Sequence, residues 1–185
     1  MLFPFKRAPH SRSGALSRCL SLSAVFGSAL LATTLPAAAD ISVRFIEGAP
    51  KDRFIIENTG DCTLGSLDVS IDLGTAAVGL IFDTSSAGAG VEVFQPFEVA
   101  QGADQLADAI IPTDGDTAVE LTLSGLAIEG VFAFTVDIDD TGENSELGQI
   151  RVSDSEIAGA SVTINGAEGV FGRDAAALID HDCLS

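Results

Sequence analysis

Apolar and polar residues alternate along much of the chain after residue 40. The alternation is strict over 67–73 and 119–124, and over 132–138 the even-numbered positions Phe132 and Phe134 share one apolar face. A period of two is typical of β-strands that bury one face and expose the other. We therefore predict strands over 41–45, 53–57, 67–73, 79–83, 91–99, 119–124, 132–138, 150–152 and 161–165.

Clusters of Gly, Asn, Asp and Ser separate these segments and predict turns. Short strands with turn signals at such intervals indicate an all-β fold, an antiparallel β-sandwich of Ig-like or jelly-roll type architecture with little helix. Helical turns are expected only over 102–110 and over 174–179, where Asp174 is a candidate N-cap. The chain has neither Trp nor Tyr, so it lacks the core Trp and the tyrosine corner of true immunoglobulin domains.

Residues 1–39 have the composition of a cleavable secretory signal peptide. Residues 1–18 contain four basic residues and no acidic one. An apolar stretch follows over 20–35, and Pro36 and three alanines come after it. Cys19 precedes that stretch, which argues against a lipidated cysteine. We expect cleavage before Asp40, a secreted or periplasmic product without a membrane span, and a single domain over 40–185.

Charge narrows the range of partners. The whole chain has a formal net charge of −18, but the first 39 residues hold four of its nine basic residues and none of its 27 acidic ones. The exported part therefore has five basic and 27 acidic residues, a net charge of −22. This charge argues against nucleic acid as a partner, and it favours cationic partners or bound divalent metal. The alternative is an acidic surface suited to a salty environment.

Two cysteines remain after signal cleavage, Cys62 and Cys183. In an oxidising compartment an even pair predicts a disulfide, here one that ties the C-terminus to an early loop. Two unrelated free thiols are the alternative.

The densest acidic segment is a candidate calcium site. Its candidate ligands are Asp137, Asp139, Asp140 and Glu143. Calcium prefers several oxygen ligands in a flexible loop, but an EF-hand counted from Asp137 would have Gly148 instead of Glu at its last position. A solvated hairpin turn is the alternative. Asp114 and Asp116 form a weaker candidate pair, with Asp83 as a potential neighbour.

Enzyme chemistry has little support in these residues. The exported part has one histidine, His181, and no GxSxG turn to present a serine. A single histidine also excludes zinc sites that need two or three. A hydrolase with a carboxylate active site is the least favoured class, and we expect a protein that is not an enzyme and has no catalytic residues.

A strand edge offers a different function. Pro96 within 91–99 places that segment at a sheet edge or divides it, and an exposed Phe94 or Phe97 there would favour strand addition from another chain. The alternative is that Pro96 bends the chain and both rings enter the core.

Three stretches resemble a known family. They are DISVRFIEGAPKDRFIIENTG with Cys62 following, GLIFDT through VEVFQPFEV, and FTVDIDDT with SEIAGASVTI later in the chain. They resemble exported "aggregation factor core" proteins of marine-type alphaproteobacteria, a label borrowed from a sponge adhesion factor. The resemblance implies an extracellular or periplasmic β-sandwich with a role in calcium-linked adhesion, and it points to Asp137, Asp139 and Asp140.

The expected function is therefore an exported, non-enzymatic binding or adhesion module that uses calcium. Its expected partner is an extracellular or cell-surface protein or glycan. The alternative is a structural or matrix protein that self-assembles through a strand edge.

Overall fold

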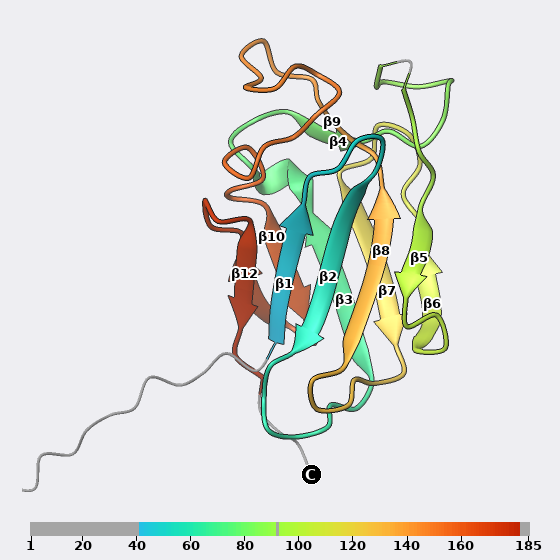
Figure 1. Ribbon diagram of the computed structural model, residues 1–185, viewed down its shortest axis with the longest axis vertical. Coiled ribbons are helices and arrows are strands. Elements are labelled where there is room, and N and C mark those ends of the chain that lie inside the picture. The colour runs from blue at the N-terminus through green and yellow to red at the C-terminus, as the bar shows by residue number, and fades with distance from the viewer. Residues whose placement is uncertain (1–40, 92, 182–185) are drawn as a thin grey trace, which may run out of the picture. The chain divides into compact units, whose positions relative to one another are not determined.

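Antiparallel strands form nearly all of the regular structure in the computed structural model, which describes residues 41–91 and 93–181 (Figure 1). The strands are β1 (Ile41–Ile46), β2 (Asp52–Asn58), β3 (Leu67–Asp72), β4 (Leu80–Phe82), β5 (Glu98–Gln101), β6 (Leu106–Ile110), β7 (Ala118–Leu123), β8 (Val131–Val136), β9 (Ile138–Asp140), β10 (Ser161–Ile164), β11 (Ala167–Val170) and β12 (Ala176–Ile179). The helical structure among the described residues is one 3-10 turn, η1 (Leu73–Thr75). The predicted all-β fold with little helix is confirmed. The predicted signal segment and Cys183 lie outside the described residues.

Two sheets of five strands stack face to face (Figure 1). The first sheet has the order β12-β1-β2-β8-β5 and the second has the order β11-β10-β3-β7-β6. A separate two-stranded ribbon, β4–β9, lies at the end of the sandwich that is at the top of Figure 1. The chain crosses repeatedly between the sheets, and this is the expected β-sandwich.

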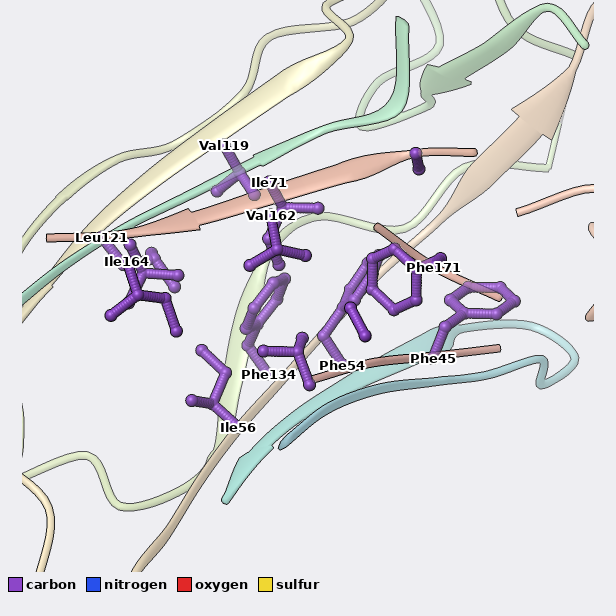
Figure 2. Packing of buried hydrophobic residues seen from close by; sticks show 14 of the residues in the cluster. Phe45, Phe54, Ile56, Ile71, Val119, Leu121, Phe134, Val162, Ile164 and Phe171 are labelled. Carbon is purple, nitrogen blue, oxygen red and sulfur yellow. The ribbon is translucent and has the colours of Figure 1, made fainter. Parts of the chain in front are cut away.

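The core fills the space between the sheets and is built around phenylalanine. Phe134 stacks on Phe54, with ring centroids 5.1 Å apart, and on Phe97, at 4.9 Å. Figure 2 shows the rings of Phe54 and Phe134 facing Ile71 and Val162 from the second sheet. The alternation in the sequence explains the arrangement, because every second residue of a strand points to the same side.

Both helical expectations are wrong. β6 occupies much of 102–110 and pairs with β7, and β12 occupies 176–179 and pairs with β1. Each segment gains backbone hydrogen bonds from an open sheet edge, which outweighs the weak helix propensity of so short a stretch. Ala175 also has a φ of 55°, and this left-handed conformation prevents a helix that starts at Asp174.

Two strand expectations also need correction. Among the described residues of 91–99, a strand is present only at the end, where β5 (Glu98–Gln101) begins after Pro96, which has no N–H to donate to a ladder. Around Ile150 the chain turns instead, and the N–H of Arg151 donates to the carbonyl of Gly148 over 3.2 Å. Phe94 is half-buried, and Phe97 packs on the core.

Helices give no evidence of a membrane span. Within residues 41–91 and 93–181, none is long and apolar enough to cross a bilayer.

Candidate metal site

The β4–β9 ribbon brings three aspartates onto one face. Phe82 of β4 pairs with Ile138 of β9, and both side chains are buried in the core. The N–H of Asp83 donates to the carbonyl of Asp137 over 3.0 Å, which extends the pairing by one residue. Because side chains alternate across a strand, Asp83, Asp137 and Asp139 lie on the face opposite to Phe82 and Ile138.

These three carboxyl groups are buried and poorly satisfied. The exposed fractions of Asp83, Asp137 and Asp139 are 0%, 4% and 1%. Among the described residues, no group donates a hydrogen bond to either oxygen of Asp83, to Oδ2 of Asp137 or to Oδ1 of Asp139. A buried carboxylate without a donor is costly, so such a group calls for a proton, a water or a cation.

The pKa values of these carboxyls also indicate that they need a proton or a cation. Burial first, and then the nearby carboxyls of Asp114 and Asp139, together raise the pKa of Asp83 to about 7. Burial also raises the pKa of Asp137 to about 7, with a second contribution from the charge of Asp139. Asp83 meets mainly other carboxyls here, and two such groups in contact share a proton or attract a cation.

Asp114 has a different role, because it anchors the loop that follows β4. Its Oδ1 accepts from the N–H groups of Thr84 and Ser85, both at 3.0 Å, and its Oδ2 accepts from Ala89 at 2.8 Å. Burial acts to raise the pKa of Asp114, but these hydrogen bonds outweigh it and the pKa is lowered. Asp114 is therefore a charged anchor for the 84–91 loop.

The same loop closes directly over the aspartates. The N–H of Val91 donates to Oδ2 of Asp139 over 2.7 Å. A Cβ on Gly90 would lie 2.4 Å from Cγ of Asp83 and 2.7 Å from Oδ2 of Asp139. Only glycine fits at position 90 in this conformation, and its Cα occupies space beside both carboxyls.

The other predicted ligands lie elsewhere. Asp140 is the last residue of β9, lies on the same side of the strand as Ile138 and is buried. Its Oδ1 accepts a hydrogen bond from the N–H of Gly142 at 2.7 Å, while no described residue donates to its Oδ2. Glu143 is exposed. Asp116 is also exposed and binds the N–H and hydroxyl of Thr113. The structure thus brings Asp137 and Asp139 together with Asp83 and Asp114, and leaves Asp140, Glu143 and Asp116 apart.

The residue types in this region suit calcium better than their present arrangement does. In the conformation that residues 41–91 and 93–181 adopt, no three or more His, Cys, Asp or Glu side chains form a group that could hold a metal ion. Calcium needs about six to eight oxygens around one point. The unpaired oxygens of Asp83, Asp137 and Asp139 supply candidates, but these side chains would have to turn toward a common centre.

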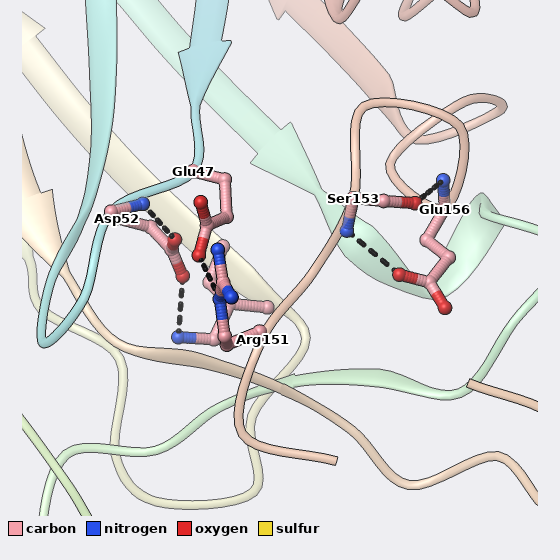
Figure 3. Close-up of polar contacts among 7 residues, drawn as sticks. Glu47, Asp52, Arg151, Ser153 and Glu156 are labelled. Carbon is pink, nitrogen blue, oxygen red and sulfur yellow. Dashed lines mark hydrogen bonds and ion pairs between the residues drawn. The ribbon is translucent and has the colours of Figure 1, made fainter. Parts of the chain in front are cut away.

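Another buried carboxyl, that of Asp52, borders this region. Its Oδ1 accepts from the N–H of Gly48 at 3.2 Å and its Oδ2 from Ile138 at 3.1 Å (Figure 3). Burial raises the pKa of Asp52 to about 8, and the charge of Asp137 contributes. Sequence reasoning missed this residue, because an acid at the start of a strand is usually exposed.

Glu156 is a buried acid with a structural explanation. Its Oε2 accepts from the N–H of Ser153 at 2.7 Å, and its N–H lies 3.3 Å from the hydroxyl of Ser153 (Figure 3). This is the reciprocal capping-box arrangement, here around a single turn. The S-x-x-E spacing in the sequence could have identified it.

The remaining candidates have simple positions. Cys62 is disulfide-bonded, while its predicted partner Cys183 lies outside the described residues, so the pairing stays a prediction. The Nε2 of His181 is 3.3 Å from the amide nitrogen of Asn165.

Comparison with known proteins does not assign the chain to a family. The chain matches no protein-family model and no curated protein.

Proposed function

We propose that the protein is an exported, non-enzymatic binding or adhesion module, and that calcium organises the loops around Asp83. The observation that carries the proposal is the Asp83 carboxyl: it is fully buried, receives no hydrogen bond from any described donor, and contacts the carboxyls of Asp114 and Asp139. A divalent cation would neutralise this cluster and give its unpaired oxygens a partner.

The donor chemistry favours calcium among metals. The candidate ligands are carboxylate oxygens, with no sulfur or imidazole among them, and oxygen-only sites suit hard cations. Magnesium demands a nearly ideal octahedron and keeps several waters, whereas calcium accepts irregular geometry. A site assembled from a ribbon and an irregular loop suits calcium better.

Export is part of the proposal. The signal-like pattern of residues 1–39 supports it, and so does the disulfide at Cys62, since such bonds persist in oxidising compartments. We place the protein in the periplasm or outside the cell, and its partner is an extracellular or cell-surface protein or glycan. The resemblance to aggregation factor core proteins motivates the adhesive role.

The decisive experiment follows thermal unfolding of the exported protein with calcium. The full chain is expressed in a bacterium with a Sec pathway, and the recovered product should begin at Asp40. Its melting temperature at pH 7.5 should rise with calcium concentration, because a ligand that binds only the folded state stabilises it. Magnesium should have a smaller effect, and Asp83→Asn should abolish the calcium response. An unchanged melt up to about 10 mM calcium, above the range of weak extracellular sites, would contradict the metal role.

Assembly through a strand edge is the second candidate. β6 is the last strand of the second sheet, and its Ile110 is 66% exposed. An edge with an exposed apolar side chain favours addition of another strand. Concentration-dependent assembly that persists in a calcium chelator, measured by light scattering, would favour this function over the first.

A further inference from the structure

The 84–91 loop is attached to the protein at two unequal points. Asp114 holds residues 84–89 through three N–H groups, those of Thr84, Ser85 and Ala89. Its last residue, Val91, is attached to Asp139 by one hydrogen bond of 2.7 Å. The Asp114 end is therefore the stronger attachment, and the Val91 end is the one that opens more easily.

Gly90 lies directly against the carboxyls of Asp83 and Asp139. Its missing Cβ would lie 2.5 Å from Oδ2 of Asp83 and 2.7 Å from Oδ2 of Asp139. An ion that approaches both carboxyls from this side would meet Gly90. Because the unpaired oxygens of Asp83 are fully buried, an ion can reach them only when the chain around them moves, and Gly90 lies against them.

Open space adjoins the loop: a hollow of about 270 Å³ is lined by Ser85, Ser86, Gly88, Gly90 and Val91. If Gly90 and Val91 are displaced, the hydrogen bond from Val91 to Asp139 breaks, while the hydrogen bonds from Thr84, Ser85 and Ala89 to Asp114 can stay in place.

We propose that Gly90 and Val91 form a gate over Asp83, shut by the Val91–Asp139 hydrogen bond and displaced when calcium binds. This inference rests on the proposed calcium function and adds its regulation. Part of the binding free energy is spent on opening the gate, so the intrinsic affinity of the site is higher than the observed one. The displaced segment is also the part of the surface that changes with calcium.

Two measurements test the gate. The first is amide hydrogen exchange by NMR on the wild-type protein with and without calcium. Calcium should accelerate exchange at Val91 about tenfold or more, the change expected when one hydrogen bond to a charged group is lost. The amides of Thr84, Ser85 and Ala89 should stay protected, because Asp114 still holds them.

The second measurement is the calcium affinity of Gly90→Ala by titration calorimetry. The added Cβ forces the segment away from the carboxyls, so calcium no longer has to open the gate and should bind about tenfold more tightly. Gly65→Ala is the matched control, because a Cβ there meets nothing within 4 Å, and its affinity should equal that of the wild type.

The outcomes separate the two proposals. Calcium binding to neither the wild type nor Gly90→Ala overturns both. Wild-type binding with no change in Val91 exchange overturns the gate alone. Equal or weaker affinity in Gly90→Ala also overturns the gate and leaves the calcium function standing.

Discussion

Oδ2 of Asp52 accepts a hydrogen bond from the backbone N–H of Ile138 over 3.1 Å, and so links the start of β2 to the start of β9. Its Oδ1 accepts from Gly48 in the turn before β2. One buried carboxyl therefore fastens a turn of the first sheet to the ribbon that carries the candidate metal site. The protonation of Asp52 should affect both.

Stability should fall as the pH rises through the neutral range. Burial, followed by the charge of Asp137, raises the pKa of Asp52 to about 8. In the unfolded chain the pKa of the same group is about 3.9. Between these values the folded state binds more protons, so the free energy of unfolding decreases with pH, by at most about 1.4 kcal/mol per pH unit for this group. Urea unfolding from pH 5 to pH 8 in a chelator should show the slope.

Asp52→Asn should reduce that slope, because the neutral amide does not titrate. It should also cost about 1 kcal/mol at pH 5, since the amide NH₂ cannot accept from a backbone N–H. Asp116→Asn is the control: Thr113 lowers the pKa of this exposed group, so its titration ends below the range measured. A wild-type free energy of unfolding that is flat from pH 5 to pH 8 would contradict the role of Asp52.

The sequence pattern predicts much of the sandwich but only part of the site. Strict alternation found β3 and β7, which pair along their whole length, because each buries one face. The same period places Asp137 and Asp139 together, and it also sends Asp140 to the opposite face, so adjacency alone was a poor guide there. β6 and β12 were missed because their pairing with a sheet edge, not their own pattern, makes them strands.

Contacts between distant segments explain what could not be predicted. Asp83 lies near Asp139 only because β4 pairs with β9. The sequence pattern of neither segment predicts that pairing. Asp52 looks like an ordinary surface acid until the ribbon covers it. A single sequence shows which residues can share a face, but not which faces meet.

Asp83→Asn should stabilise the calcium-free protein. The substitution removes one buried charge beside Asp114 and Asp139 and brings an amide donor toward their carboxylates. We expect a gain of about 1–2 kcal/mol in the free energy of unfolding at pH 8 in a chelator, measured in urea. Glu143→Gln, at an exposed acid of the same acidic segment, should change it by less than about 0.5 kcal/mol. Destabilisation by Asp83→Asn without calcium would show that Asp83 has a donor after all.

Asn58 should be one of the most sensitive polar positions. Its side chain is fully buried, and its amide nitrogen donates to the carbonyls of Cys62, Leu126 and Ala127, at 2.8 to 3.2 Å. Asn58→Ala removes a buried donor from the Cys62 carbonyl and one of the two donors from each of the Leu126 and Ala127 carbonyls, which keep the N–H groups of Leu64 and Gly130. The substitution should cost about 2–4 kcal/mol. Thermal and urea unfolding would measure the loss. Asn144→Ala, at an exposed position, should be nearly neutral, and an equally mild Asn58→Ala would mean that water replaces the amide.

Phe134 should hold Phe97 in the core. Phe134 is fully buried and stacks on Phe97 at 4.9 Å, so Phe134→Ala should cost about 3–5 kcal/mol. If the two rings support each other, Phe97→Ala should cost about 0.5–1.5 kcal/mol less in the Phe134→Ala background than in the wild type, the coupling typical of aromatic pairs. A double-mutant cycle by urea unfolding measures this difference. Additive losses would mean that the two rings do not support each other. A negligible loss from Phe97→Ala alone would mean that Phe97 contributes little to the core and is available to a strand that adds at the β5 edge.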